Sequence, residues 1–292
     1  NIVVAVDIQG SSYERIYAFN KTGGNFWTAG DSDNYEVYNP RAIAIDYDGN
    51  RIVVGGRYVY MYDTSINDTY LWRQTGQNLL MYYGGEIYIS DDGKYALGRV
   101  CYGNNGCGYY SSYDKIYAWD EDTDNSSSDN VWVKTIAANS ISFSADGQTA
   151  VVLTVNNDII FYDFATGNVT KSFNENQLKG YSSAISADGE VLVAGSHDSS
   201  DIVIINIHNV GTLTEYSLSN KVDTDMVRFS GDDTAFVAIH GGTHINYYYT
   251  DSASYSWTVA SIRLFLQSSG RATAFRPLWH PLATSQQKYG HI

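Results

Sequence analysis

Positive charge is scarce in this sequence of 292 residues: 18 lysine and arginine residues stand against 32 aspartate and glutamate residues, and the formal net charge is −14. Such an excess of negative charge repels phosphate backbones and anionic lipid surfaces, so nucleic acid is not an expected partner. Long hydrophobic runs are also missing. No stretch of about 18 apolar residues occurs, so the sequence predicts no transmembrane helix.

Cysteine is equally rare, with two residues in the whole chain. Cys101 and Cys107 lie in one glycine-rich segment, and a hairpin can bring residues at this spacing together. We therefore expect a disulfide between them and, with it, an extracellular or cell-surface location. The first residue is Asn1 and not methionine, which agrees with removal of a secretory signal, with an incomplete start of the sequence as the alternative.

Asn-x-Ser/Thr sequons stand near several predicted turns, where glycosylation requires them. About this many arise by chance in a chain so rich in asparagine, serine and threonine, so they are compatible with a secreted glycoprotein and do not identify one. The sequon asparagines are Asn20, Asn67, Asn125 and Asn168.

Glycine and tyrosine are abundant, with 26 residues of each, whereas proline occurs 3 times. This composition favours short strands joined by tight turns. One turn signal recurs after an alternating apolar segment, and its Asp-Gly pair tolerates the positive φ of a tight hairpin. Its copies are Asp46-Tyr47-Asp48-Gly49, Ser90-Asp91-Asp92-Gly93, Ser144-Ala145-Asp146-Gly147, Ser186-Ala187-Asp188-Gly189 and Ser230-Gly231-Asp232-Asp233.

A second signal, an aromatic or apolar segment that ends in Asp or Asn, follows these turns. Between the two signals we expect an apolar strand that is buried on both faces. The repeated unit is thus a strand, an Asp-Gly turn, a buried strand, a loop, an aromatic strand and a polar outer strand. Copies of the second signal are Ile16–Asn20, Tyr60–Asp63, Ile116–Asp120, Ile160–Asp163, Ile204–Asn206 and, more loosely, Tyr247 and Tyr248.

This unit resembles a blade of the WD-repeat and TolB-like β-propeller superfamily, in which a Ser-x-Asp-Gly turn follows the first strand and an aromatic-Asp pair closes the third. Trp119-Asp120 matches the WD dipeptide, and Tyr62-Asp63 is a conservative version of it. The Gly-His dipeptide of many WD blades is missing, so the TolB-like kind is the better comparison. The resemblance covers residues 1 to about 260 and implies an all-β fold, a single β-propeller of four-stranded antiparallel blades.

Six copies of the third strand and five of the first favour six blades, with seven as the alternative. The chain begins inside a blade at Ile2 to Val6, so the missing first strand has to come from the C-terminal part. The candidate is Ile262 to Leu266, followed by Ser268-Ser269-Gly270. Strands from the two ends would then share one blade and close the ring. The propeller is expected to span residues 1–270.

Composition changes after Asp251, because no acidic residue follows it while three arginines and a lysine do. Residues 271–292 are predicted to be a basic C-terminal tail or a degenerate extra blade. One hypothesis is that this tail docks on an acidic, tyrosine-rich face of a neighbouring copy and builds a filament. The other is that it folds back on its own ring or stays disordered. Candidate interaction residues are Tyr109, Tyr110, Tyr113, Arg271, Phe275, Arg276 and Trp279.

An acidic tract after the Trp119-Asp120 pair invites a metal-site interpretation. Asp120, Asp122 and Asp124 alternate like the start of a calcium loop. The glycine and the closing glutamate of such a loop are replaced by Asn125 and Val131, so a solvated acidic loop is the favoured interpretation. Calcium is the one cofactor that this tract suggests.

The favoured function is a non-enzymatic extracellular scaffold, either a protein-interaction module or a self-assembling subunit of a surface fibre or layer. Its expected partner is protein, including further copies of itself, with carbohydrate as a second class. The alternative is a secreted propeller hydrolase, lactonase-like or glycan-processing, with its site at the axial channel. That alternative needs converging carboxylates, histidines or a metal. His240 and His244 are predicted on a loop between strands and not on a helix, which argues against a zinc motif.

Overall fold

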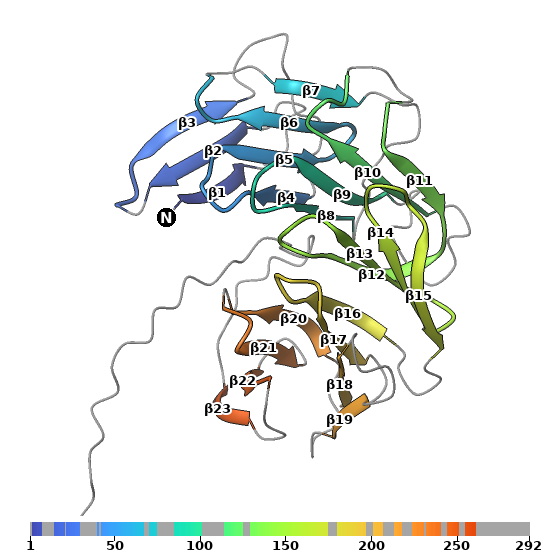
Figure 1. Ribbon diagram of the computed structural model, residues 1–292. Helices are drawn as coiled ribbons and strands as arrows, with labels where there is room; N and C mark the ends of the chain where they lie inside the picture. Colours follow the sequence, from blue (N-terminus) through green and yellow to red (C-terminus); the bar gives the residue numbers. More distant parts are fainter. Residues whose placement is uncertain are drawn as a thin grey trace, which may run out of the picture.

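The computed structural model describes a set of segments between residues 2 and 260. Every regular element among them is a β-strand (Figure 1). No helix within this part of the chain has the length and hydrophobicity needed to cross a membrane. The described residues are 2–7, 15–20, 22–29, 40, 42–66, 70–74, 85–100, 114–124, 129–174, 180–196, 201–206, 213–217, 224–230, 232–240, 244–250 and 255–260.

The strands form six antiparallel sheets, and each sheet is built from strands that are consecutive in the chain. Sheet one has three strands, β1 (Ile2–Asp7), β2 (Arg15–Asn20) and β3 (Asn25–Ala29). Sheets two to six have four strands each. They are β4 (Ala42–Ile45), β5 (Arg51–Gly55), β6 (Val59–Asp63) and β7 (Tyr70–Gln74); β8 (Glu86–Ile89), β9 (Tyr95–Val100), β10 (Lys115–Asp120) and β11 (Trp132–Thr135); β12 (Ala138–Phe143), β13 (Thr149–Thr154), β14 (Asp158–Asp163) and β15 (Val169–Asn174); β16 (Gly180–Ile185), β17 (Val191–Ser196), β18 (Asp201–Asn206) and β19 (Leu213–Ser217); β20 (Thr224–Phe229), β21 (Ala235–His240), β22 (His244–Tyr249) and β23 (Tyr255–Ala260).

The four-stranded unit expected from the sequence is confirmed in sheets two to six. Each recurrent turn joins the first and second strands, which pair antiparallel. The second strands are the buried ones, as expected: Ile52, Val53 and Val54 of β5 have no exposed surface. The chain is therefore an all-β protein with several four-stranded antiparallel sheets, an arrangement consistent with propeller blades.

The recurrent turn takes the positive φ that its Asp-Gly pair predicts. Gly49, Gly93, Gly147 and Gly189 have φ between 73° and 79°. In the fifth copy Asp233 takes this position with φ 56°, so the turn keeps its geometry even where the glycine is replaced.

Serine and aspartate of the Ser-x-Asp-Gly turn are held by each other and by the backbone. In the second copy, Ser90 Oγ donates to Asp92 Oδ1 at 2.7 Å and accepts the backbone N–H of Tyr95 at 3.0 Å. Asp92 Oδ1 also accepts the N–H of Lys94 at 3.1 Å. The same contacts recur at Ser144, Ser186 and Ser230. These side chains close the hairpin locally, which explains their spacing.

The aromatic-Asp pairs are where one sheet packs on the next. Trp27 of β3 meets Tyr62 of β6 with ring centroids 5.4 Å apart. Trp132 of β11 meets Tyr162 of β14 at 5.7 Å, and Trp72 of β7 meets Trp119 of β10 at 6.1 Å. In each case a tryptophan on the last strand of one sheet packs against the aromatic residue of the aromatic-Asp pair in the next sheet. The aromatic residue of this pair therefore also contributes to packing between sheets.

The three strands of sheet one correspond to the second, third and fourth strands of the other sheets. The β2–β3 pair has a register shift between Ala18 and Phe19, and the β6–β7 pair has one at the same place, between Met61 and Tyr62. β1 contacts β4, as β5 contacts β8. Sheet one therefore lacks the counterpart of a first strand among the described residues. The candidate for it, Ile262 to Leu266, lies outside them.

The sheets follow one another along an arc from β1 to β23 (Figure 1). The first strands of sheets two to six contact each other in sequence, β4 with β8, β8 with β12, β12 with β16 and β16 with β20. First strands consequently line the inside of the arc, and the fourth strands lie outside.

Candidate binding face

The strand order places two turns of every four-stranded sheet at the same end. In an antiparallel sheet of consecutive strands, the first and third strands run in the same direction, so the turns that follow them share one edge. These turns contain the Ser-x-Asp-Gly motif and the residues after the aromatic-Asp pair. We call the surface formed by both kinds of turn the turn face.

Backbone hydrogen bonds connect the turns of neighbouring sheets. The N–H of Tyr47 donates to the Asp91 carbonyl at 3.2 Å, and the N–H of Asp91 donates to the Ala145 carbonyl at 2.7 Å. The N–H of Ala145 donates to the Ala187 carbonyl at 3.1 Å. The N–H of Ala187 then donates to the Asp233 carboxylate at 2.8 Å. Five turns are thus joined into one continuous surface.

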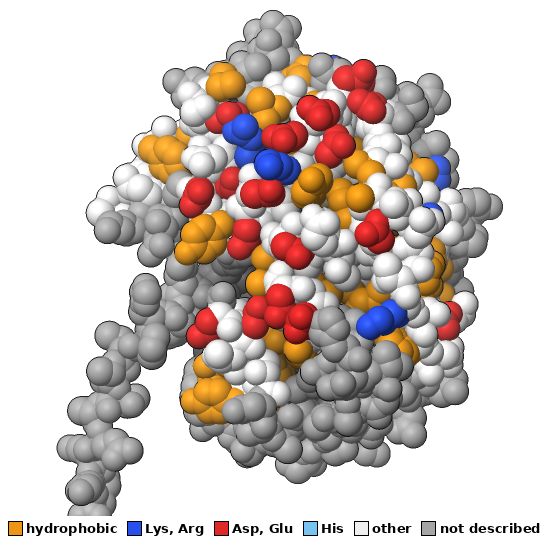
Figure 2. All heavy atoms as spheres, viewed as in Figure 1, with side chains coloured by type: hydrophobic (Ala, Val, Ile, Leu, Met, Phe, Trp, Pro, Cys, Tyr) orange, Lys and Arg blue, Asp and Glu red, His pale blue; other side chains and the backbone are white. Residues whose placement is uncertain are grey.

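The turn face is strongly acidic. Of the 32 acidic residues in the chain, 16 are described residues in or beside these turns, where the basic residues are Arg51 and Lys94. The opposite ends of the strands carry mixed charge, such as Arg57 and Arg73 alongside Asp158. Figure 2 shows a face with many acidic side chains and few basic ones. The acidic residues of the turn face are Asp46, Asp48, Asp63, Asp91, Asp92, Asp120, Glu121, Asp122, Asp124, Asp129, Asp146, Asp163, Asp188, Glu190, Asp232 and Asp233.

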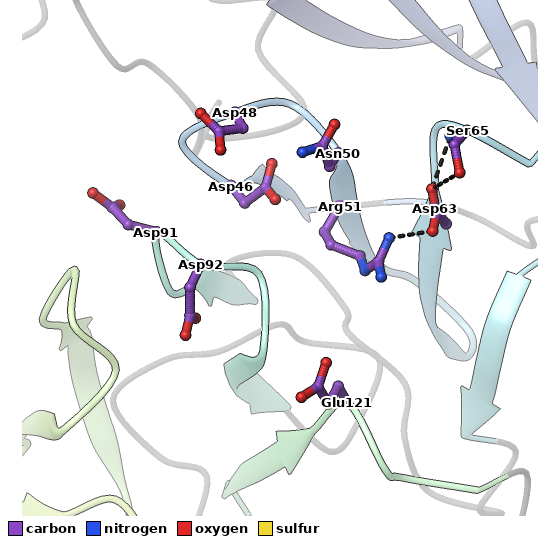
Figure 3. Close-up of a pocket in the computed structure, with 9 residues that line it drawn as sticks. All are labelled: Asp46, Asp48, Asn50, Arg51, Asp63, Ser65, Asp91, Asp92 and Glu121. Atoms are coloured by element: carbon purple, nitrogen blue, oxygen red, sulfur yellow. Dashed lines mark hydrogen bonds and ion pairs between the residues drawn. The ribbon is translucent and has the colours of Figure 1, made fainter.

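A pocket of about 300 Å³ opens in this face between sheets two and three (Figure 3). Four turns contribute to it, the two turns of sheet two and the two turns of sheet three. Six carboxylates and one cationic side chain line it. The lining residues are Asp46, Asp48, Asn50, Arg51, Asp63, Ser65, Asp91, Asp92 and Glu121.

The single cation of the pocket is already paired. Arg51 forms an ion pair with Asp63, which also accepts hydrogen bonds from the Ser65 hydroxyl at 2.6 Å and the Ser65 N–H at 2.8 Å (Figure 3). Burial acts to raise the pKa of Asp63, but the Ser65 hydrogen bonds and the Arg51 charge outweigh it and lower that pKa. Asp63 therefore stays ionised and neutralises Arg51.

Asp46 is the one buried residue among those that line the pocket. It takes the place of the serine of the other four turns, and the residue is exposed by 6%. Burial raises the pKa of Asp46, and the charge of Asp48 adds to the rise, whereas the backbone N–H groups of Arg51, Gly49 and Asn50 lower it. Oδ1 of Asp46 has no hydrogen-bond partner. The serines at this place in the other four turns, in contrast, all form hydrogen bonds through Oγ.

A second cluster of polar residues lies on strands β8, β9 and β12, away from the turn face. Glu86 of β8 forms an ion pair with Arg99 of β9 at 3.4 Å and accepts the N–H of Ile141 at 2.9 Å. Arg99 donates to the Ala138 carbonyl at 2.6 Å, and the Ser140 hydroxyl donates to Glu86 at 3.3 Å. These contacts join sheets three and four. The charges of Glu86 and Arg99 are thus compensated by each other and by hydrogen bonds to sheet four.

Tyr88 and Arg228 meet although their sheets are not neighbours. Tyr88 belongs to β8 of sheet three and Arg228 to β20 of sheet six, and the guanidinium carbon lies 6.0 Å from the ring centroid. Burial raises the pKa of Tyr88 to about 12, although Arg228 acts to lower it. The first strands therefore approach a common centre. A hydrolase site at such a centre stays a prediction.

The sequence-predicted acidic tract lies on the turn face. Asp120 Oδ1 accepts a hydrogen bond from the Thr123 hydroxyl at 3.3 Å, and the N–H of Asp124 donates to Asp129 at 2.6 Å. Asp122 is exposed. Within the described segments, no group of three or more His, Cys, Asp or Glu side chains is arranged to hold a metal ion.

Other predicted site residues divide between described and undescribed parts of the chain. Asn20 and Asn168 are exposed at turns, as glycosylation requires. His240 is the last residue of β21 and His244 the first residue of β22, and the two lie opposite each other in register. The expectation that they are not on a helix is confirmed, but the expectation that they lie on the loop is wrong, because the strand pairing extends to both. The residues outside the described segments are Asn67, Cys101, Cys107, Tyr109, Tyr110, Tyr113, Asn125, Arg271, Phe275, Arg276 and Trp279.

The pocket itself was not predicted from the sequence. Its carboxylates come from separate copies of the repeat, and each one matches a turn motif that has a local structural role. Asp46 was the available signal, because it departs from serine in an otherwise constant position.

Comparisons with known proteins add no functional assignment to this geometry. No protein-family model matches the sequence, and no curated protein matches it.

Proposed function

We propose that the chain is a six-bladed β-propeller that acts outside the cell as a non-enzymatic interaction scaffold, and that it assembles with further copies of itself. The repeated unit resembles the blades of the WD-repeat and TolB-like superfamily. Sheets joined through their first strands, and the Tyr88–Arg228 contact between sheets three and six, support a ring-like arrangement.

The incomplete sheet one supports closure by the C-terminal part of the chain. Ile262 to Leu266, followed by Ser268-Ser269-Gly270, has the pattern of a first strand and its turn. Pairing of this segment with β1 would give sheet one the four strands of its neighbours, with β1 paired on both sides. This splice makes the ring of six blades complete.

The observation that carries the scaffold function is the acidic turn face. Sixteen carboxylates gather there, whereas residues 252–292 contain three arginines and one lysine and no acidic residue. Opposite charges of this kind steer association and set its orientation. Docking of residues 271–292 of one copy on the turn face of the next is a head-to-tail contact, and repeated contacts of this kind build a filament.

Sedimentation velocity of the full chain at low salt and at about 1 M salt tests this function, because the Debye length shrinks to roughly 3 Å at the higher salt. We expect large assemblies at low salt that dissociate at high salt, and filaments in negative-stain micrographs of the low-salt sample. The double variant Arg271→Gln and Arg276→Gln should remain monomeric in both conditions. A parent chain that is monomeric at low salt would rule out self-assembly.

A further inference from the structure

The first recurrent turn has a carboxylate, Asp46, where the other four turns have a serine. In the other four copies, a serine hydroxyl accepts the backbone N–H five residues later at 2.9 to 3.1 Å and donates to the turn aspartate at 2.6 to 2.7 Å. Serine therefore satisfies this position. Asp46 replaces it and brings a negative charge into a place with 6% exposure.

This replacement carries a cost within the turn. Burying a carboxylate without full hydrogen bonding is unfavourable, and Oδ1 of Asp46 has no partner. Gly93 of the next turn packs against this residue so closely that an added Cβ would lie 2.8 Å from Asp46 Oδ2. Residues that break a repeat at a cost in stability are expected at functional sites.

The surroundings of Asp46 define what could bind there. Besides the Arg51–Asp63 ion pair, five carboxylates line the pocket. They are Asp46, Asp48, Asp91, Asp92 and Glu121. Lys94 lies 3.7 Å from Asp92, but both side chains are about half exposed, so this pair is weak. A pocket of about 300 Å³ accommodates one planar cation and part of its aliphatic stem. The chemistry of the lining thus selects an organic cation.

We propose that this pocket binds a guanidinium group, and that Asp46 supplies the negative charge at its buried side. The occupant is Arg271 or Arg276 of a second copy, since these are two of the three basic residues in residues 271–292 and the arginine fork matches carboxylate geometry. This assignment deepens the proposed self-assembly and rests on it for the identity of the occupant.

The test titrates N-acetyl-L-arginine amide into the full chain at about 1 M salt, where assemblies are expected to dissociate. The titration is then repeated at low salt with the full-length double variant Arg271→Gln and Arg276→Gln, which should stay monomeric. Binding is measured by calorimetry, with neutral N-acetyl-citrulline amide as the matched ligand. We expect the arginine compound to bind at low salt, the citrulline compound not to bind, and Asp46→Ser to weaken arginine binding about tenfold. Asp122→Asn removes a charge from the turn face outside the pocket and should weaken binding less than about twofold.

Asp46→Ser restores the serine of the other turns, so the variant is expected to fold, and its circular dichroism should equal that of the parent. Equal binding by Asp46→Ser and parent, or equal loss in Asp46→Ser and Asp122→Asn, would overturn the pocket assignment even if the chain assembles. Arginine binding that depends on Asp46 in a chain that never assembles would support the pocket and contradict self-assembly. The two proposals therefore fail separately.

Discussion

At the residue scale, the raised pKa of Asp46 predicts that its ionised carboxylate opposes folding. The Asp46 carboxyl is buried against Gly93 and interacts with the backbone N–H groups of its own turn. Its Oδ1 atom, however, has no hydrogen-bond partner. Serine at the equivalent positions 90, 144, 186 and 230 makes two or three side-chain hydrogen bonds and carries no charge. Stability and binding thus make opposite demands on this residue.

Asp46→Ser is expected to stabilise the folded chain at neutral pH by about 1 kcal/mol, or roughly 2–4 °C in Tm. Because the pKa of Asp46 is raised in the folded state, ionisation of this carboxyl opposes folding. The penalty is absent below the unfolded pKa and grows as pH rises toward the folded pKa. Thermal unfolding at neutral pH and near pH 3 measures the difference, which should vanish at the acidic pH.

The reciprocal change provides the control. Ser144→Asp introduces the same carboxylate into a turn without the pocket and should destabilise the chain at neutral pH. A gain in Tm from Asp46→Ser that is as large near pH 3 as at neutral pH would contradict the electrostatic explanation.

At the scale of single elements, the recurrent turn depends on glycine for two reasons that can be separated. Gly147 has φ 73°, and an added Cβ would lie 2.6 Å from Tyr95 Cδ2 of sheet three. Gly23 has φ 80°, but an added Cβ would meet nothing within 4 Å. Gly23 thus isolates the backbone contribution.

Gly147→Ala is expected to cost about 3 kcal/mol, from backbone strain together with overpacking against Tyr95. Gly23→Ala should cost about 1 kcal/mol, from backbone strain alone. Urea unfolding of both variants measures these costs. Equal costs would show that packing between the turns of sheets three and four contributes nothing to stability.

Closure of sheet one is also a question about one strand. If Ile262 to Leu266 pairs with β1, then Leu264→Pro removes a ladder hydrogen bond in the middle of that strand and should lower the stability by about 3 kcal/mol. Thr273→Pro, beyond the expected strand, should change stability by less than about 0.5 kcal/mol. Thermal unfolding compares the two. A Leu264→Pro variant as stable as the parent would rule out this splice.

The strands could be predicted from the sequence because their signals are local. An Asp-Gly turn, an apolar strand and an aromatic-Asp pair each act within a few residues, and Tyr62-Asp63 and Trp119-Asp120 lie where the pattern placed them. The pocket could not be predicted, because it depends on how turns from two sheets meet. Asp63 and Glu121 are 58 positions apart in sequence and converge only after sheets two and three have packed.

At the scale of the whole molecule, the repeat distributes charge unevenly. Because every copy places its acidic turns at the same end of the strands, a motif that stabilises single hairpins also produces one strongly acidic face. Backbone hydrogen bonds from Tyr47 through Asp91, Ala145 and Ala187 hold this face together. A local solution for turns thereby yields a surface suited to a basic partner.

Cryo-electron microscopy of the full chain at low ionic strength tests the central claim most directly, which is that the acidic turn face receives the basic segment of another copy. We predict filaments of stacked rings in which density for residues 271–292 of one copy lies on the turn face of the next, with an arginine side chain in the pocket beside Asp46. Isolated rings whose turn face is bare at low ionic strength would contradict it.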